Sequence, residues 1–382
     1  MVLGVTGCGT SALRRAETAH IRLTTDEPSR YAQRFAAEME RTRSAFVDTF
    51  FQCAEVGDAD PLDVVAFREV DAFERYMAHR WDVEDVHGFV TTRPQRLVER
   101  PPALALRTRP SDALRLFRHE LTHRLVARCT PQAPAWMDEG LAEVLETANV
   151  RDGALHVGTP PYFFHDLGVD AAHVGGTVTE YVPRGALLTI DALRSLPRGA
   201  MVVAGDRMAT RARYASAWAL VAVLTTGPDE AKVAFAAYRR ALRTGASPDR
   251  AWTENLAQLP LDDLYASFID SDERWLVSYA VTGVANVQPE VRVLSDRERD
   301  LFWARDLPWD TAEGREQALS HLDDLVRRDP GAASDPEVVT LRAAILLEGG
   351  DLQRAASGLA AAPPSGQVAF ARLALSVAID PL

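Results

Sequence analysis

The first half of the chain alternates between apolar runs typical of buried strands and apolar spacing typical of helices. The runs predict short strands at 20–25, 62–67, 88–92 and 103–107. Helical spacing, with Ser, Asp or Pro near each start, predicts helices at 26–51, 71–80, 110–128 and 135–147. Because strands and helices come first and a helical remainder follows, the expected fold class is α+β.

The second half is helical apart from one irregular stretch. Residues 151–199 are rich in Gly and Pro and lack clean periodicity, so we expect a long surface excursion that lines a cleft. Helical periodicity returns at 209–224 and 229–244.

After residue 281 the pattern predicts short helical hairpins, with helices at 316–329, 337–348 and 352–361. Pro330 and Pro364 are 34 residues apart, the period of a tetratricopeptide repeat, and this segment resembles a degenerate unit of that kind. Fewer than three units fit, so an ordinary helical cap on the main domain explains the pattern equally well. The expected domains are an N-terminal tail (1–19), a main domain (20–285) and a helical C-terminal region (286–382), which is a candidate surface for a protein partner.

The composition excludes several classes of protein. The chain has 382 residues, 47% of them apolar, which allows a large core and excludes a disordered chain. Its net charge of −12 argues against a nucleic-acid binder, which needs a basic face. The longest apolar run, at 215–224, is too short to span a bilayer.

The three cysteines lie in two kinds of context. Cys53 and Cys129 are in apolar helical segments and are expected to be small buried hydrophobic side chains. Val5-Thr6-Gly7-Cys8 resembles a bacterial lipobox, but the few residues before it lack a basic region and an apolar core. Either the reading frame starts further upstream or the match is accidental. The first case predicts a cell-envelope or extracellular protein lipid-anchored at Cys8, and the second a cytoplasmic one.

One segment of the predicted helix at 110–128 has the spacing of a metal site. It reads H-E-x-x-H, and its residues are His119-Glu120-Leu121-Thr122-His123. Residues four apart in a helix share a face, so His119 and His123 can bind one metal ion. Glu120, at the edge of that face, can reach a metal-bound water as a general base, which is the chemistry of zinc hydrolases. Chance produces this pattern in roughly one such chain in a hundred.

The next predicted helix offers a third ligand. Glu139 and Glu143 lie one turn apart on it, so Glu139 can bind the metal while Glu143 accepts the distal N–H of a histidine ligand. A solvated acidic helix face is the simpler explanation for two such carboxylates alone. Metzincins instead place a Gly and a His after the second histidine, where this chain has Val126 and Cys129.

These two segments together resemble the gluzincin metallopeptidases, the clan of thermolysin and the zinc aminopeptidases, and in style the bacterial peptidase MA-like domains. The second segment reads Trp136-Met137-Asp138-Glu139-Gly140-Leu141-Ala142-Glu143. The resemblance implies a zincin-like domain with zinc bound by His119, His123 and Glu139, Glu120 as general base and Glu143 behind the ligands. One departure is that only fifteen residues separate His123 from Glu139, so the connecting loop must be shorter than in those enzymes.

The predicted function is therefore a zinc metallopeptidase that cleaves a peptide or protein substrate. The resemblance also suggests Tyr214 as a hydrogen-bond donor to the reaction's oxyanion, although an aromatic residue packed on the core explains it as well. His156, His165 and His173 lie in the irregular stretch, where each either faces the cleft or is an ordinary solvated loop histidine. The strand at 103–107 is a candidate edge strand for substrate pairing.

Two other functions fit the same residues. One is a non-catalytic, envelope-anchored protein that keeps a zincin fold to bind partners. The other is a zinc hydrolase that acts on a non-peptide amide. The intact Glu120 favours an enzyme, because a degenerate scaffold would be expected to lose the general base first.

Overall fold

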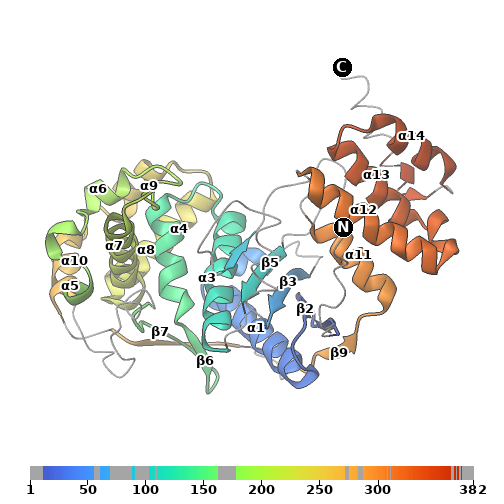
Figure 1. Ribbon diagram of the computed structural model, residues 1–382. Coiled ribbons are helices and arrows are strands. Elements are labelled where there is room, and N and C mark those ends of the chain that lie inside the picture. Colours follow the sequence, from blue (N-terminus) through green and yellow to red (C-terminus); the bar gives the residue numbers. More distant parts are fainter. Residues whose placement is uncertain are drawn as a thin grey trace. The chain divides into compact units, whose positions relative to one another are not determined.

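The computed structural model describes most of the chain (Figure 1). The described residues are 12–55, 61–68, 88–90, 103–107, 110–161, 178–271, 275–282, 287–307, 309, 311–362, 365–366, 368–369 and 371. Most are helical and two small sheets accompany the helices, so the predicted α+β class is confirmed. The predicted helix at 71–80 and the residues Cys8, His165 and His173 lie outside the described part.

The chain divides into two compact units that are not consecutive in sequence. One comprises Met1–Ala36, Asp60–Arg109 and Pro289–Leu382, and the other Ala37–Ala59 and Pro110–Gln288. This division differs from the linear tail, domain and C-terminal region expected above.

A six-stranded sheet lies in the first unit, in the order β4-β5-β3-β2-β1-β9. Its parallel strands are β2 (Ile21–Thr25), β3 (Leu62–Phe67) and β5 (Ala103–Arg107). Strand β3 is apolar and buried at nearly every position, as a strand covered on both faces requires. Helix α1 (Ser29–Thr49) connects β2 to β3.

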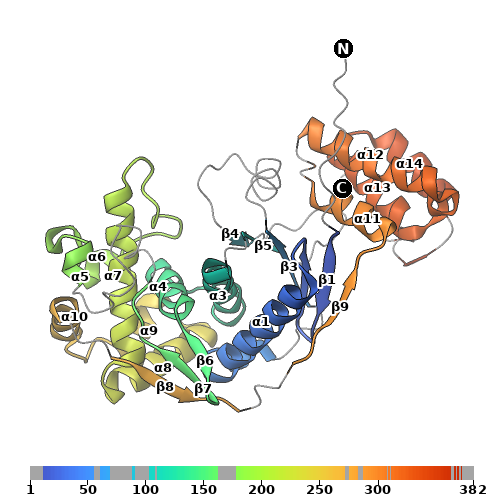
Figure 2. The same cartoon turned by 60° about the horizontal axis from the view of Figure 1, so that its bottom comes forward.

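The sheet's outer strands pair antiparallel with their neighbours. They are β4 (Gly88–Val90), β1 (Arg14–Glu17) and β9 (Glu290–Val293). Strand β5 (103–107) was a candidate edge strand, but it has a neighbour on each side and does not lie at an edge. The outermost described strand on that side of the sheet is β4. Strand β1 falls in the predicted tail and β9 in the predicted C-terminal region, and the two lie side by side (Figure 2).

Among the residues of this unit that the structure describes after β9 there are four longer α-helices. They are α11 (Asp296–Asp306), α12 (Ala312–Arg328), α13 (Pro336–Glu348) and α14 (Leu352–Ala361). Leu322 of α12 and Ile345 of α13 lie in one apolar core with Leu301 of α11, next to Trp309. Leu359 of α14 lies in a second apolar core, which α14 shares with α13. The last three helices confirm the predicted segments, whereas α11 was not predicted.

The second unit is built mainly from helices. Its long helices are α3 (Pro110–Cys129), α4 (Ala135–Glu146), α7 (Arg207–Thr226) and α8 (Asp229–Arg243), and its shorter ones α5 (Val178–Tyr181), α6 (Ile190–Arg194), α9 (Pro248–Asn255) and α10 (Leu261–Asp270). Helix α4 packs against both α3 and α7. In the described part of the chain, every helix is too short or too polar to cross a bilayer.

The stretch predicted as an irregular excursion contains regular structure. Strands β6 (Asn149–Arg151) and β7 (Ala154–Val157) form a hairpin, and β7 pairs with β8 (Val277–Ala280). Asp152 and Gly153 at the turn both have positive φ, of 53° and 72°. This is the geometry that an Asp-Gly pair favours in a two-residue hairpin, so the sequence contained a turn signal that the Gly and Pro content obscured.

Helices α4 and α7 approach closely at Gly140. A methyl group on Gly140 would come within 2.5 Å of the Ala217 carbonyl oxygen and of Val221 Cγ2. Glycine therefore allows the two backbones to meet, and it fixes the position of α4 against α7.

Gly140→Ala should lower the free energy of unfolding by about 2 kcal/mol, because the added methyl group overpacks the helix contact. Thermal and urea unfolding would measure the change. Gly358→Ala is the matched control, because Gly358 is a helical glycine and an added methyl group there would meet nothing within 4 Å. That variant should gain up to about 1 kcal/mol from helix propensity. Equal effects of the two substitutions would contradict the close contact.

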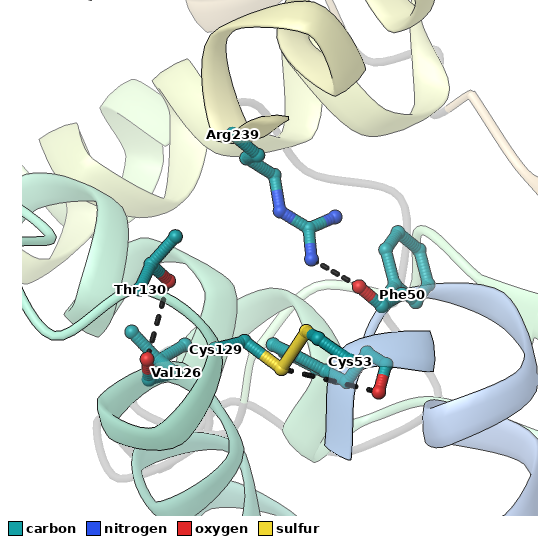
Figure 3. Close-up of a disulfide and its surroundings, with 7 residues drawn as sticks. Phe50, Cys53, Val126, Cys129, Thr130 and Arg239 are labelled. Atoms are coloured by element: carbon teal, nitrogen blue, oxygen red, sulfur yellow. Dashed lines mark hydrogen bonds between the residues drawn. A yellow bond between two sulfur atoms is a disulfide. The ribbon is translucent and has the colours of Figure 1, made fainter. Parts of the chain in front are cut away.

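A disulfide joins Cys53 to Cys129 (Figure 3). Cys53 lies in the short helix Gln52–Glu55 that follows α1, and Cys129 is the last residue of α3. Cys129 is buried as expected, but Cys53 is only partly buried, and the expectation of two small buried hydrophobic side chains missed their disulfide. Arg239 of α8 donates a hydrogen bond to the Phe50 carbonyl oxygen beside the disulfide, and its guanidinium lies 5.2 Å from the Phe51 ring centroid.

Reduction of the disulfide should destabilise the second unit. The two cysteines are 76 residues apart, and a crosslink over such a loop contributes about 4 kcal/mol through the unfolded chain. The thermal midpoint should fall when a phosphine reductant is added. A Cys53→Ala, Cys129→Ala double variant should start at the lower midpoint and not respond to reductant; a wild type that does not respond would argue against the crosslink.

Candidate metal centre

Helices α3 and α4 form an antiparallel hairpin that brings together two histidines and a glutamate. His119 and His123 lie one turn apart on α3, and their Nε2 atoms are 3.1 Å from each other. Glu139, in the first turns of α4, places its Oε2 atom 3.9 Å from His119 Nε2 and 3.5 Å from His123 Nε2. Three ligand atoms from two helices thus surround one point.

These distances fit a zinc ion. Ligands about 2.0–2.1 Å from a tetrahedral zinc are about 3.4 Å from one another, close to the separations seen here. Glu139 Oε2 is buried and has no hydrogen-bond partner among the residues the structure describes. A buried carboxylate oxygen without a donor is costly unless a cation satisfies it, so the donor set and its geometry both fit the metal.

Two carboxylates that were not predicted from the sequence contact the Nδ1 atoms of the histidines, on the side away from the shared point. His123 Nδ1 is 2.8 Å from Asp138 Oδ1, and His119 Nδ1 is 3.3 Å from Glu146 Oε2. A carboxylate can only accept a hydrogen bond, so each Nδ1 atom carries a proton and each Nε2 atom is the one that can offer a lone pair to a metal ion at the shared point. Carboxylates in this position are typical of histidine-bound zinc.

Glu143, which the resemblance places behind the ligands, lies further from the histidines than Glu146 does. Its Oε1 atom is 3.9 Å from His119 Nδ1, and its Oε2 atom has no partner among the described residues. Burial raises the pKa of Glu143 well above its usual value, and the charges of Glu146 and Glu139 raise it further. At 3.9 Å, against 3.3 Å for Glu146, Glu143 is not the nearest carboxylate to His119 Nδ1.

Glu120 and Tyr214 also belong to this cluster. The Glu120 carboxylate is partly buried, and its charge acts on His123, Glu139 and Tyr214. Tyr214 lies two turns into α7, and its phenol is close enough to the Glu139 carboxylate to interact with it. Burial raises the pKa of Tyr214 far above its usual value, and the nearby carboxylates add to the shift, so the phenol keeps its proton.

His156 lies away from the cluster, and so does Cys129, at the position where metzincins place a third histidine. Cys129 is in the disulfide, and His156 lies on β7, where its Nδ1 atom is 2.8 Å from Ser278 Oγ. His156 therefore belongs to the small sheet and not to the three-ligand group.

The chain was also compared with known proteins. No family model matches the sequence, and no curated protein shows a significant match.

The carboxylates of this cluster should affect how the stability of the metal-free protein depends on pH. Burial lowers the pKa of His123, but the hydrogen bond to Asp138 and the charges of Glu139, Asp138 and Glu120 outweigh it and raise the pKa to about 9 from the ordinary 6.5. Protonated His123 therefore stabilises the fold fully below pH 6.5, and this contribution is lost as the pH rises through about 9.

Asp138→Asn should lower the His123 pKa and remove this part of the pH dependence. Urea unfolding of both zinc-free proteins between about pH 6 and pH 10 would measure it. The difference in unfolding free energy between wild type and variant should be largest at the acidic end. Parallel pH profiles for the two proteins would show that Asp138 does not control His123.

Proposed function

We propose that this chain is a zinc-dependent metallopeptidase with a gluzincin-like site. The observation that supports it best is the meeting of His119 Nε2, His123 Nε2 and Glu139 Oε2 at one point, with that glutamate oxygen otherwise unpartnered among the described residues. Two imidazoles and a carboxylate are a ligand set of hydrolytic zinc enzymes, in which a further coordination position stays open.

Zinc in such a site lowers the pKa of water and polarises a carbonyl oxygen. The chain's own residues then handle the protons. Glu120, beside both histidines, accepts the proton of the attacking water and returns it to the leaving amine. Tyr214 keeps its proton and is available to donate a hydrogen bond to the oxygen on which negative charge develops.

The alternatives remain a hydrolase of a non-peptide amide, for which the ligand set is equally suitable, and a non-catalytic envelope-anchored binding protein. The retention of Glu120 next to the ligands favours an enzyme over the binding protein. Substrate choice depends on residues around the ligands and not on the ligands themselves.

We also propose that the protein works in an oxidising compartment, in the cell envelope or outside the cell. The Cys53–Cys129 disulfide supports this location, because such bonds are rare in reducing cytosol. This argument is independent of the lipobox resemblance at Cys8, and lipid attachment there stays a separate proposal.

Purified wild type should bind one equivalent of zinc and hydrolyse members of a mixed peptide library. Glu120→Gln should keep the zinc and lose about 10²–10⁴-fold in rate, because only the proton acceptor is removed. Metal analysis and product detection by mass spectrometry would give both quantities. Glu230→Gln, on the exposed start of α8, is the control and should match wild type.

Each contrary result has a distinct meaning. Absence of zinc from the wild type would refute the metal site. Zinc without turnover on any peptide would favour the binding protein or the non-peptide amide, and equal rates for wild type and Glu120→Gln would remove Glu120 from its role.

A further inference from the structure

An arginine, a glutamate and a histidine form a chain on the outer side of the metal cluster. Arg115 Nη1 lies 3.0 Å from Glu146 Oε2, and the same oxygen lies 3.3 Å from His119 Nδ1. Arg115 and His119 are one turn apart on α3, and Glu146 is the last residue of α4. We propose that Glu146, held by Arg115, is the positioning residue that orients His119 for the metal; this inference rests on the proposed zinc site.

The position of Glu146 suits this role better than that of Glu143, which the sequence pattern favours. Its side chain is only 2% exposed, and its carboxylate lies 3.3 Å from His119 Nδ1 against 3.9 Å for Glu143. Arg118 adds a hydrogen bond of 3.4 Å to the Glu146 carbonyl oxygen. Two arginines of α3 therefore fix both the main chain and the side chain of Glu146.

The same residues do not form a second metal site. His119, Glu143 and Glu146 offer donor atoms close enough to hold a cation. The Arg115 guanidinium already pairs with the Glu146 oxygen that such an ion would need, and it repels another cation. His119 would also have to give up its Nδ1 proton while its Nε2 lone pair faces the other ligands.

The Arg115 guanidinium lies against the buried Glu146 carboxylate and offsets part of the cost of burying that charge. The Glu146 carboxylate fixes the orientation of the His119 ring and makes its Nε2 atom a stronger ligand for a metal ion. Outer contacts of this kind typically contribute about 10–100-fold to metal affinity. Removing the charge of Glu146 should therefore weaken zinc binding without removing any ligand.

The test compares Glu146→Gln with Glu143→Gln. Competition with a chromophoric chelator gives the zinc affinity, and thermal unfolding of the zinc-free proteins reports whether each variant folds. Glu146→Gln should bind zinc about 10–100-fold more weakly than wild type, and Glu143→Gln within about threefold of it. Equal affinity of Glu146→Gln and wild type, or a larger loss in Glu143→Gln, would overturn the proposal.

Arg115 provides a second, independent pair of variants if Glu146→Gln does not fold. Arg115→Gln should also weaken zinc binding, and Arg115→Lys should recover part of the loss because it keeps the charge. Cobalt spectra should shift in Arg115→Gln and return toward wild type in Arg115→Lys. An Arg115→Gln protein with the zinc affinity and cobalt spectrum of wild type would refute the proposed Arg115–Glu146–His119 linkage. A wild type that binds no zinc would instead refute the metal site itself.

Discussion

The antiparallel packing of α3 against α4 determines which side chains can meet in this molecule. In such a hairpin, residues early in α4 face residues late in α3, so Asp138 and Glu139 meet His123. Residues late in α4 face residues early in α3, so Glu146 meets His119 and Arg115. A slip of one turn between the helices would separate every one of these pairs.

Contacts elsewhere in the second unit stabilise this alignment. On the side toward α7, Gly140 allows a backbone approach that a methyl group would prevent, and Tyr214 of α7 interacts with the Glu139 carboxylate. At the end of α3, Cys129 is bonded to Cys53. The site is therefore supported on rigid helices, as a metal centre requires.

The sequence predicted the elements and the residues that depend on local periodicity. His119, Glu120 and His123 follow from positions four apart in one helix, and Glu139 from the start of the next. Asp138, Glu146 and the disulfide could not be found this way, because they depend on how two segments align in space. Strands β1 and β9 were missed for a similar reason: each is four residues long, carries charged side chains, and is defined only by pairing with a distant strand.

We propose that α3 and α4 together hold one zinc ion through His119, His123 and Glu139. Anomalous X-ray diffraction at the zinc edge, from crystals of zinc-loaded protein, tests it most directly. A single strong peak bonded to the Nε2 atoms of both histidines and to a Glu139 oxygen is expected. A peak bonded to His119 Nδ1 with Glu143 and Glu146, or no peak in this unit, would contradict it.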